Sequence, residues 1–186
     1  MYDACAAPGG KAVALETAGA RVLAADAHHE RMGRLADTTR RAGVAIHTVA
    51  ANLEAAPLRP GSMDAVLVDA PCSATGTIRR HPDARWRLRP GVFQRLAERQ
   101  TRLLNAAAPL VRPAGGLLIY ATCSIESEEN DSVVERFLIQ HPEFTRTPRS
   151  QPGPFSELLT PDGAFRSYPQ RDGIDGAFAA RMIRAS

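Results

Sequence analysis

Short apolar runs alternate with amphipathic stretches along most of this 186-residue chain. The apolar runs have the length and the branched side chains of buried strands, and turn-forming residues bound them. They predict strands at residues 3–5, 21–25, 44–49, 65–68, 116–122 and 177–184. Apolar positions at helical spacing and terminal glycines predict helices over residues 11–18, 30–42 and 92–110, and another that begins at Ser127.

Strands that alternate with helices predict an α/β fold with a doubly wound, mostly parallel sheet. Only Met1 and Tyr2 precede the first strand, so we expect it to be too short for a central position. Residues 77–90 are predicted as an irregular basic loop, and residues 147–176, rich in Pro, Gly and Ser, as a second loop. No repeat or linker divides the chain, so we expect residues 1–186 to form one domain.

An acid and two thiols follow two of the predicted strands. Asp69 and Cys72 come just after residues 65–68, and Cys123 comes just after residues 116–122. Because ligands bind at the carboxyl ends of parallel strands, we expect these side chains to face one crevice. A free cysteine is usually a small core residue, but both of these lie among polar, turn-forming residues. The pattern favours at least one reactive thiol and does not indicate which.

A glycine turn, Gly9-Gly10, lies between the first strand and the first helix. Such a turn lets a ligand approach the backbone, and the helix N-terminus favours a negative group there. The turn matches neither the Gly-x-Gly-x-x-Gly pattern nor a P-loop, which argues against a nicotinamide-dependent oxidoreductase. Asp26, at the end of the second strand, can accept hydrogen bonds from both hydroxyls of a ribose, although such an Asp is as often a helix cap. Together these features predict a nucleoside-containing cofactor with a carboxylate or phosphate end.

Arginine supplies nearly all of the positive charge. Lys11, in the glycine turn, is the sole lysine among 23 basic residues, and the net charge is +3. Nine arginines and two acids lie between Arg79 and Arg112, which gives +7 there and −4 for the remainder. This segment indicates a polyanionic partner, although a solvated helix face would have the same composition. Within it His81 and Trp86 could stack on unpaired bases, and local packing of Trp86 is the alternative.

The composition also excludes several classes of protein. No apolar run approaches the roughly 18 residues of a membrane span, and the first residues lack the pattern of a signal peptide. Three widely spaced cysteines fit neither a disulfide framework nor a zinc site. We therefore expect a cytoplasmic monomer with no bound metal and no membrane partner.

An ordered set of motifs resembles the RsmB/Sun-type RNA cytosine-5 methyltransferases through nearly the whole chain. The motifs are Asp3-Ala-Cys-Ala-Ala-Pro-Gly-Gly-Lys11, Asp69-Ala-Pro-Cys-Ser-Ala-Thr-Gly76, Ile78-Arg-Arg-His-Pro-Asp83, Ala121-Thr-Cys-Ser124, Glu128-Glu-Asn130 and Asp175-Gly-Ala-Phe178. The resemblance is greatest to the bacterial members that act on 16S ribosomal RNA. Any one of these motifs would be weaker evidence than the set.

The resemblance implies a Rossmann-like methyltransferase fold with S-adenosyl-L-methionine as cofactor. It also implies methylation of carbon 5 of a cytosine in RNA, through a covalent adduct between a cysteine and carbon 6. Cys123 then corresponds to the nucleophile, Cys72 to the thiol that assists product release, and Asp69 to a residue near cofactor and base. Cofactor binding is implied for Cys5, Ala6, Ala7, Pro8, Gly9, Gly10, Lys11, Asp26, Asn52 and Asp69. Contacts with RNA are expected from Arg79, Arg80, His81 and Trp86.

The chain departs from the family pattern in two respects. Asn52 stands where family members usually have an aspartate on the adenine side of the cofactor. Family members also carry an RNA-binding region and the start of the catalytic domain ahead of the position of Asp3. We therefore expect residues 1–186 to be the catalytic domain without those parts, with weak or no activity alone. The alternative is a non-catalytic remnant that binds RNA or the cofactor.

Overall fold

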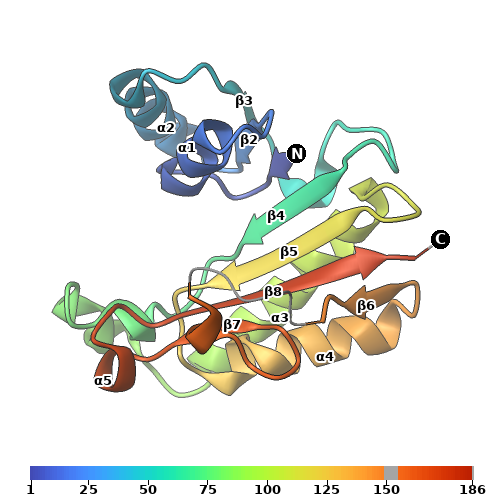
Figure 1. Ribbon diagram of the computed structural model, residues 1–186. Helices are drawn as coiled ribbons and strands as arrows, with labels where there is room; N and C mark the ends of the chain where they lie inside the picture. Colours follow the sequence, from blue (N-terminus) through green and yellow to red (C-terminus); the bar gives the residue numbers. More distant parts are fainter. Residues whose placement is uncertain (149–154, 186) are drawn as a thin grey trace.

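The computed structural model describes residues 1–148 and 155–185 and is shown in Figure 1. In these residues eight strands form one sheet. They are β1 (Tyr2–Asp3), β2 (Leu23–Asp26), β3 (His47–Ala50), β4 (Ala65–Asp69), β5 (Leu117–Thr122), β6 (Phe144–Arg146), β7 (Phe165–Ser167) and β8 (Ala177–Arg184). Their order is β3-β2-β1-β4-β5-β8-β6, with β7 paired to β8 outside this path. β1 to β5 pair in parallel and β6 to β8 pair antiparallel, as a mostly parallel sheet requires.

Helices cover both faces of this sheet. They are α1 (Gly10–Thr17), α2 (His29–Ala42), α3 (Val92–Ala107), α4 (Asp131–Gln140) and the short α5 (Pro169–Asp172). Ala24 and Ala25 are successive residues of β2, so their side chains point to opposite faces. Ala24 packs in a cluster with Leu35 of α2, whereas Ala25 belongs to a larger cluster with Leu104 of α3 and Phe137 of α4. Figure 1 accordingly shows α1 beside α2, and α3 beside α4 along β5 and β8.

The prediction that the first strand is too short for a central position is wrong. Tyr2 of β1 lies opposite Leu23 of β2 on one side and opposite Val66 of β4 on the other. Main-chain bonds extend the pairing past the strand, because the Ala4 N–H donates to the Leu67 carbonyl at 2.9 Å. The chain therefore runs outward from β1 to β3 and then returns to the far side of β1 as β4. The strand order thus reverses between β1 and β4, which makes their carboxyl ends the topological switch point of the sheet. Ligands bind at this point in such folds.

The other predicted strands are confirmed, with ends that differ by at most three residues. The two predicted loops contain more structure than expected. The basic loop includes a short 3₁₀ helix, Pro82–Arg87, and the segment predicted as loop after residue 147 contains β7 and α5. β6 was also not predicted. Both short strands form because they pair with β8, a contact distant in sequence. Residues 149–154 of the predicted second loop lie outside the described residues.

Two glycines allow close approaches that shape the carboxyl edge of the sheet. Gly9 has a φ of +110°, and a Cβ atom there would lie 2.7 Å from Cδ1 of Leu35. Gly76 is enclosed by backbone: its N–H donates to the Cys123 carbonyl at 3.0 Å, and its carbonyl accepts from the Gly176 N–H at 2.9 Å. Gly76 therefore joins the loops after β4 and β5 to the segment that leads into β8.

Gly76→Ala is expected to destabilise the protein by about 1–3 kcal/mol, because overpacking against rigid backbone costs that much. The added Cβ would lie 2.2 Å from the Gly176 carbonyl oxygen and 2.8 Å from that of Cys123. Urea unfolding measures the change. The matched control is Gly33→Ala in α2, where a Cβ meets nothing within 4 Å and the substitution is expected to be neutral or stabilising. Equal effects of the two substitutions would contradict the close packing at Gly76.

Candidate active site

A cavity of about 480 Å³ opens at the carboxyl ends of β1, β2, β4 and β5, beside the switch point. Sites for small molecules and cofactors have volumes of about 300–1,000 Å³. The predicted site residues that line it are Cys5, Ala7, Lys11, Asp26, Asn52, Asp69, Cys72 and Cys123. The structure thus brings together predicted site residues from five separate segments of the chain. Four residues of the predicted cofactor loop, Ala6, Pro8, Gly9 and Gly10, do not line the cavity.

Lys11 and Asp69 form an ion pair across this cavity. The Lys11 Nζ atom lies 2.7 Å from Oδ2 of Asp69, and both side chains are partly exposed. Lys11 comes from the first turn of α1 and Asp69 from the last residue of β4, so the pair spans the switch point. The positively charged ammonium group of Lys11 is therefore held at the edge of the sheet where the two thiols lie. Its charge acts on the nearby Cys123 thiol.

Cys72 and Cys123 face each other, with their Sγ atoms 3.2 Å apart. The hydrogen bond from Cys72 is the largest influence on Cys123 and lowers its pKa, and the charge of Lys11 acts in the same direction. The same hydrogen bond, followed by burial, raises the pKa of Cys72. The partner thiol is thus the main reason for the lowered pKa of Cys123. The geometry therefore favours a thiolate on Cys123 and a proton on Cys72.

Asp26 and Asn52 supply further polar groups to the lining of the cavity. Asp26 is buried, and its Oδ1 accepts from the His28 N–H at 2.9 Å. α2 has no side-chain cap, so the interpretation of Asp26 as a helix cap is wrong, and the residue lines the cavity as the ribose-binding interpretation requires. The Oδ1 of Asn52 accepts from the Glu54 N–H at 3.1 Å. α1 begins without a side-chain cap, so its N-terminus can receive a negative group.

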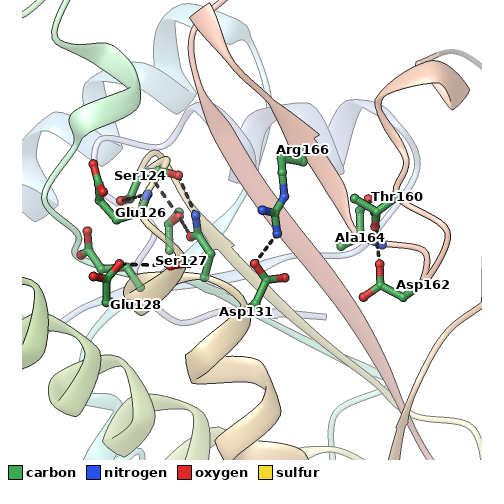
Figure 2. Close-up of polar contacts among 12 residues, drawn as sticks. Ser124, Glu126, Ser127, Glu128, Asp131, Thr160, Asp162, Ala164 and Arg166 are labelled. Carbon is green, nitrogen blue, oxygen red and sulfur yellow. Dashed lines mark hydrogen bonds and ion pairs between the residues drawn. The ribbon is translucent and has the colours of Figure 1, made fainter.

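A buried polar network, which the sequence did not reveal, lies behind the two thiols. At its centre is Glu129, which is 0% exposed and accepts hydrogen bonds from Ser73 and Gln100. The Ser73 hydroxyl is in turn hydrogen-bonded to the Ser124 hydroxyl. The Ser124 hydroxyl oxygen also accepts a hydrogen bond from the Glu126 N–H at 3.1 Å. Figure 2 shows Ser124 and Glu126 in the loop that follows β5. The motif containing Glu129 was a signal in the sequence, but no role could be assigned to it.

The start of α4 is tied to the C-terminal strands by an ion pair, also drawn in Figure 2. Asp131 pairs with Arg166 of β7. The Arg166 guanidinium also lies over the ring of Phe178 on β8, 5.2 Å from its centroid. These contacts fix the segment that carries Glu129 against the rest of the sheet.

Asp3 is a second buried acid that sequence reasoning did not include among the site residues. Its side chain is 0% exposed, and in the described residues neither oxygen meets a donor at hydrogen-bonding distance and angle. Burial, followed by the charge of Asp69, raises its pKa to about 7, and the Cys5 amide and Lys11 oppose that shift only in part. The strand pairing of β1 explains why it is buried. No local pattern could have indicated it.

The predicted RNA-binding residues lie outside the cavity. Trp86 is 74% exposed, and the guanidinium of Arg85 lies over its ring at 4.9 Å from the centroid, so Trp86 does not act as a buried packing anchor. Arg80 pairs with Asp175 at 2.8 Å, and Arg79 donates to the Gly173 carbonyl at 3.3 Å, and both remain exposed. His81 is exposed as well. Sequence reasoning missed three arginines that line the cavity, Arg31, Arg99 and Arg102.

The sequence predicted neither a membrane span nor a metal site, and the described part of the chain can be searched for both. None of its helices combines the length and the apolar character needed to cross a membrane. Among the same residues, no group of three or more His, Cys, Asp or Glu side chains is arranged to bind a metal ion.

The chain matches a known family over almost its whole length. The model of the family described as 16S rRNA methyltransferase RsmB/F matches residues 1–183. The ribosomal RNA small subunit methyltransferase B of Sodalis glossinidius (strain morsitans) is 46% identical over 193 residues, which cover 99% of this chain and 41% of that protein. The chain thus spans less than half the length of the curated relatives it matches.

Solved structures agree with this match and with the predicted fold class. The structure of PH0851 has a TM-score of 0.86 at 37% sequence identity and covers 97% of this chain and 41% of its own. NSun6 from Pyrococcus horikoshii, solved with SFG, has a TM-score of 0.81 at 24% identity, over 100% of this chain and 47% of its own. The latter likeness bears on the fold alone. The predicted Rossmann-like methyltransferase fold and the predicted family resemblance are confirmed.

Asp3→Asn is expected to stabilise the protein at high pH. The folded-state pKa of Asp3 is raised from 3.8 to about 7, so stability is full below pH 4, falls as the pH rises towards 7 and is then constant. A rise of about 3 in pKa corresponds to a loss of at most about 4 kcal/mol in the free energy of unfolding. The variant would not show this loss, because Asn is neutral at every pH. Urea unfolding between pH 4 and 8 should show parent and variant diverging with pH. Parallel curves would contradict the burial of an unpaired acid.

Iodoacetamide is expected to alkylate Cys123 first at neutral pH. Its pKa is lowered, whereas burial raises the pKa of Cys5 to about 12 and the bond to Cys123 raises that of Cys72. Thiolates are the reactive species, so peptide mapping after brief labelling should find the adduct on Cys123. Cys72→Ala removes the hydrogen bond and should slow the labelling of Cys123. Faster labelling of Cys5 or Cys72 in the parent would contradict this assignment.

Proposed function

The chain belongs to the family of RsmB/F 16S rRNA methyltransferases, and from this premise we propose that it methylates carbon 5 of a cytosine in RNA. We propose 16S ribosomal RNA as the substrate and residues 1–186 as the catalytic domain. The observation that carries the proposal is the pair of thiols, 3.2 Å apart, beside an acid and a lysine in one cavity. Two thiols of opposite protonation preference suit a reaction in which one attacks and the other remains protonated.

S-adenosyl-L-methionine is the cofactor of this family, and it supplies the methyl group. The cavity residues fit it. Asp26 offers carboxylate oxygens to the hydroxyls of a ribose, and Asn52 lies beside it as a further polar contact. The N-terminus of α1 suits the carboxylate end of the amino acid part. Lys11, in the first turn of α1, adds a positive charge near that end.

The chemistry requires a nucleophile because carbon 5 of cytosine is itself unreactive. In the proposed reaction the Cys123 thiolate adds to carbon 6, and the electron pair of the 5,6 double bond shifts towards carbon 5 and the N3 edge. Asp69 lies at the end of β4 in the same cavity as this thiol, and we propose that it contacts the N3 edge. Carbon 5 then has enamine character and can accept a methyl group.

Release of the product reverses the addition. A base removes the proton from carbon 5, the pair of the carbon–hydrogen bond re-forms the double bond, and the sulfur–carbon bond breaks. Cys123 leaves as a thiolate. The Cys72 thiol can donate to that sulfur at the separation seen here, which stabilises the leaving group. This gives Cys72 the supporting role and Cys123 the attacking role.

The target base must leave its stack to reach the cavity, at a cost of a few kcal/mol. Exposed Trp86, with Arg85 over its ring, suits stacking on an unpaired neighbour. Arg79, Arg80 and His81 belong to the loop of residues 77–90, and Figure 1 shows this loop, in green, beyond the carboxyl ends of β4 and β5. We propose that these three residues contact the RNA backbone. We also propose that the chain acts as a monomer in the cytoplasm.

Since the chain spans less than half of its relatives, a binding role without turnover is the competing proposal. A radiolabelled cytosine distinguishes the two. Release of tritium from carbon 5 of labelled RNA, dependent on the methyl donor, would show turnover by this chain.

Cys72→Ala is expected to accumulate a covalent complex with RNA, and Cys123→Ala is expected to form none. The first variant retains the attacking thiol and loses the thiol that stabilises its departure. Denaturing gels with labelled 16S ribosomal RNA fragments and S-adenosyl-L-methionine measure the complex. The same RNA with its cytosines replaced by uridines serves as the substrate control. The reverse pattern would exchange the roles of the two thiols, and the absence of complex from both variants would remove the adduct mechanism.

A further inference from the structure

Glu129 is a carboxylate with no access to solvent, and burying such a group is costly unless hydrogen bonds satisfy it. Its bonds converge on one short segment. Oε1 accepts from the Ser73 N–H at 3.0 Å, and Oε2 accepts from the Ser73 hydroxyl. Oε1 also accepts from Nε2 of Gln100 at 2.9 Å, and the same Nε2 group donates to the Pro71 carbonyl at 3.0 Å. The acid is thus tied, directly and through Gln100, to the residues on each side of Cys72.

The next residue, Asn130, binds the residues on each side of the other thiol, Cys123. It is 2% exposed, and its Oδ1 accepts from the Thr122 hydroxyl at 2.6 Å. Its Nδ2 donates to the Ser124 carbonyl at 2.9 Å. Thr122 and Ser124 are the neighbours of Cys123 on each side. Two adjacent side chains therefore bind the residues that flank the two thiols.

The backbone at this point is held in place as well. The Tyr120 hydroxyl, on β5, donates to the Glu129 carbonyl at 2.5 Å. The Ser73 and Ser124 hydroxyls lie 3.2 Å apart, which closes the network between the two loops. A buried acid that served packing alone would not need a donor from the loop of Cys72 and a second donor, Gln100 of α3, that is itself bound to that loop.

We propose that Glu129 and Asn130 form a clamp whose task is to position Cys72 and Cys123 against each other. This inference rests on the proposed function only in that the two thiols are the reacting pair. Glu129 and Asn130 do not line the cavity, so they are positioning residues and not catalytic ones. Their effect on the reaction comes through the distance and direction between the two sulfur atoms.

Phenylarsine oxide tests the clamp without RNA or cofactor. Two thiols that lie side by side each form an arsenic–sulfur bond, and the arsenic-bound oxygen leaves as water with the two thiol protons. The parent chain should bind the probe far more tightly than Cys72→Ala or Cys123→Ala, which each keep one of the pair. Glu129→Gln places an amide donor against the donors of Ser73 or Gln100 and should weaken binding by at least about tenfold. Asn130→Asp should act in the same direction.

The matched control is Thr101→Val, which removes a buried hydroxyl one residue from Gln100 and away from the loops. It should bind the probe as the parent does. Where Glu129→Gln fails to fold, Ser73→Ala replaces it, because this half-buried residue carries the link between Glu129 and Ser124. Parent-like binding by the folded variants, or equal weakening by Thr101→Val, would overturn the clamp.

Kinetics supply a second measurement where the chain turns over. Misplacing a reacting group by about 1 Å can cost on the order of 100-fold in rate. Glu129→Gln should therefore lower kcat by about that factor and leave KM for S-adenosyl-L-methionine within about twofold of the parent. A rise in KM with an unchanged kcat would overturn the positioning role. Absence of the RNA adduct from both Cys72→Ala and Cys123→Ala would remove the proposed adduct mechanism, but it would leave the result with the arsenical probe standing.

Discussion

The constraint on which the site depends is the parallel pairing of β4 with β5. Their register sets Asp69 opposite Ala121, so the loops that follow the two strands leave the sheet at the same edge. Main-chain bonds continue the pairing past the strands, from the Ala70 N–H to the Ala121 carbonyl at 2.8 Å and from the Gly76 N–H to the Cys123 carbonyl at 3.0 Å. Backbone geometry therefore brings the two thiol-bearing loops together, and the buried side chains around Glu129 refine their separation.

Charge is distributed unevenly around this edge of the sheet. Lys11 and Asp69 are partly exposed, and an ion pair of that kind contributes only about 0–1 kcal/mol to stability. Its larger effect is local, because it keeps a positive charge beside Cys123. Asp3 is buried beneath the same edge, and the described part of the chain offers it no well-placed donor. A buried carboxyl group of this kind destabilises the fold locally. Such groups are typical of functional sites, where other parts of the fold supply the stability.

The sequence predicted the fold wherever the signal was local. Apolar runs gave most strands, and turn residues gave their ends. It failed where pairing across the sheet decides the outcome: β1 has two residues and is central because β2 and β4 bond it on both sides. β6 and β7 exist because β8 provides an edge for them. Glu129 was overlooked for a related reason, since an acid near the start of a helix is ordinarily solvated and only the packed loops bury it.

By itself, the sequence determined the α/β class, the positions of Asp69, Cys72 and Cys123 at strand ends, and, through its ordered motifs, the methyltransferase family. These properties follow from local periodicity and from the composition of short segments. Only the tertiary structure decided which thiol has the lowered pKa, because that depends on a partner sulfur 51 residues away and on the charge of Lys11. It alone also decided the burial of Asp3 and Glu129. Burial, and the direction in which a pKa moves, are set by neighbours that are distant in sequence and adjacent in space.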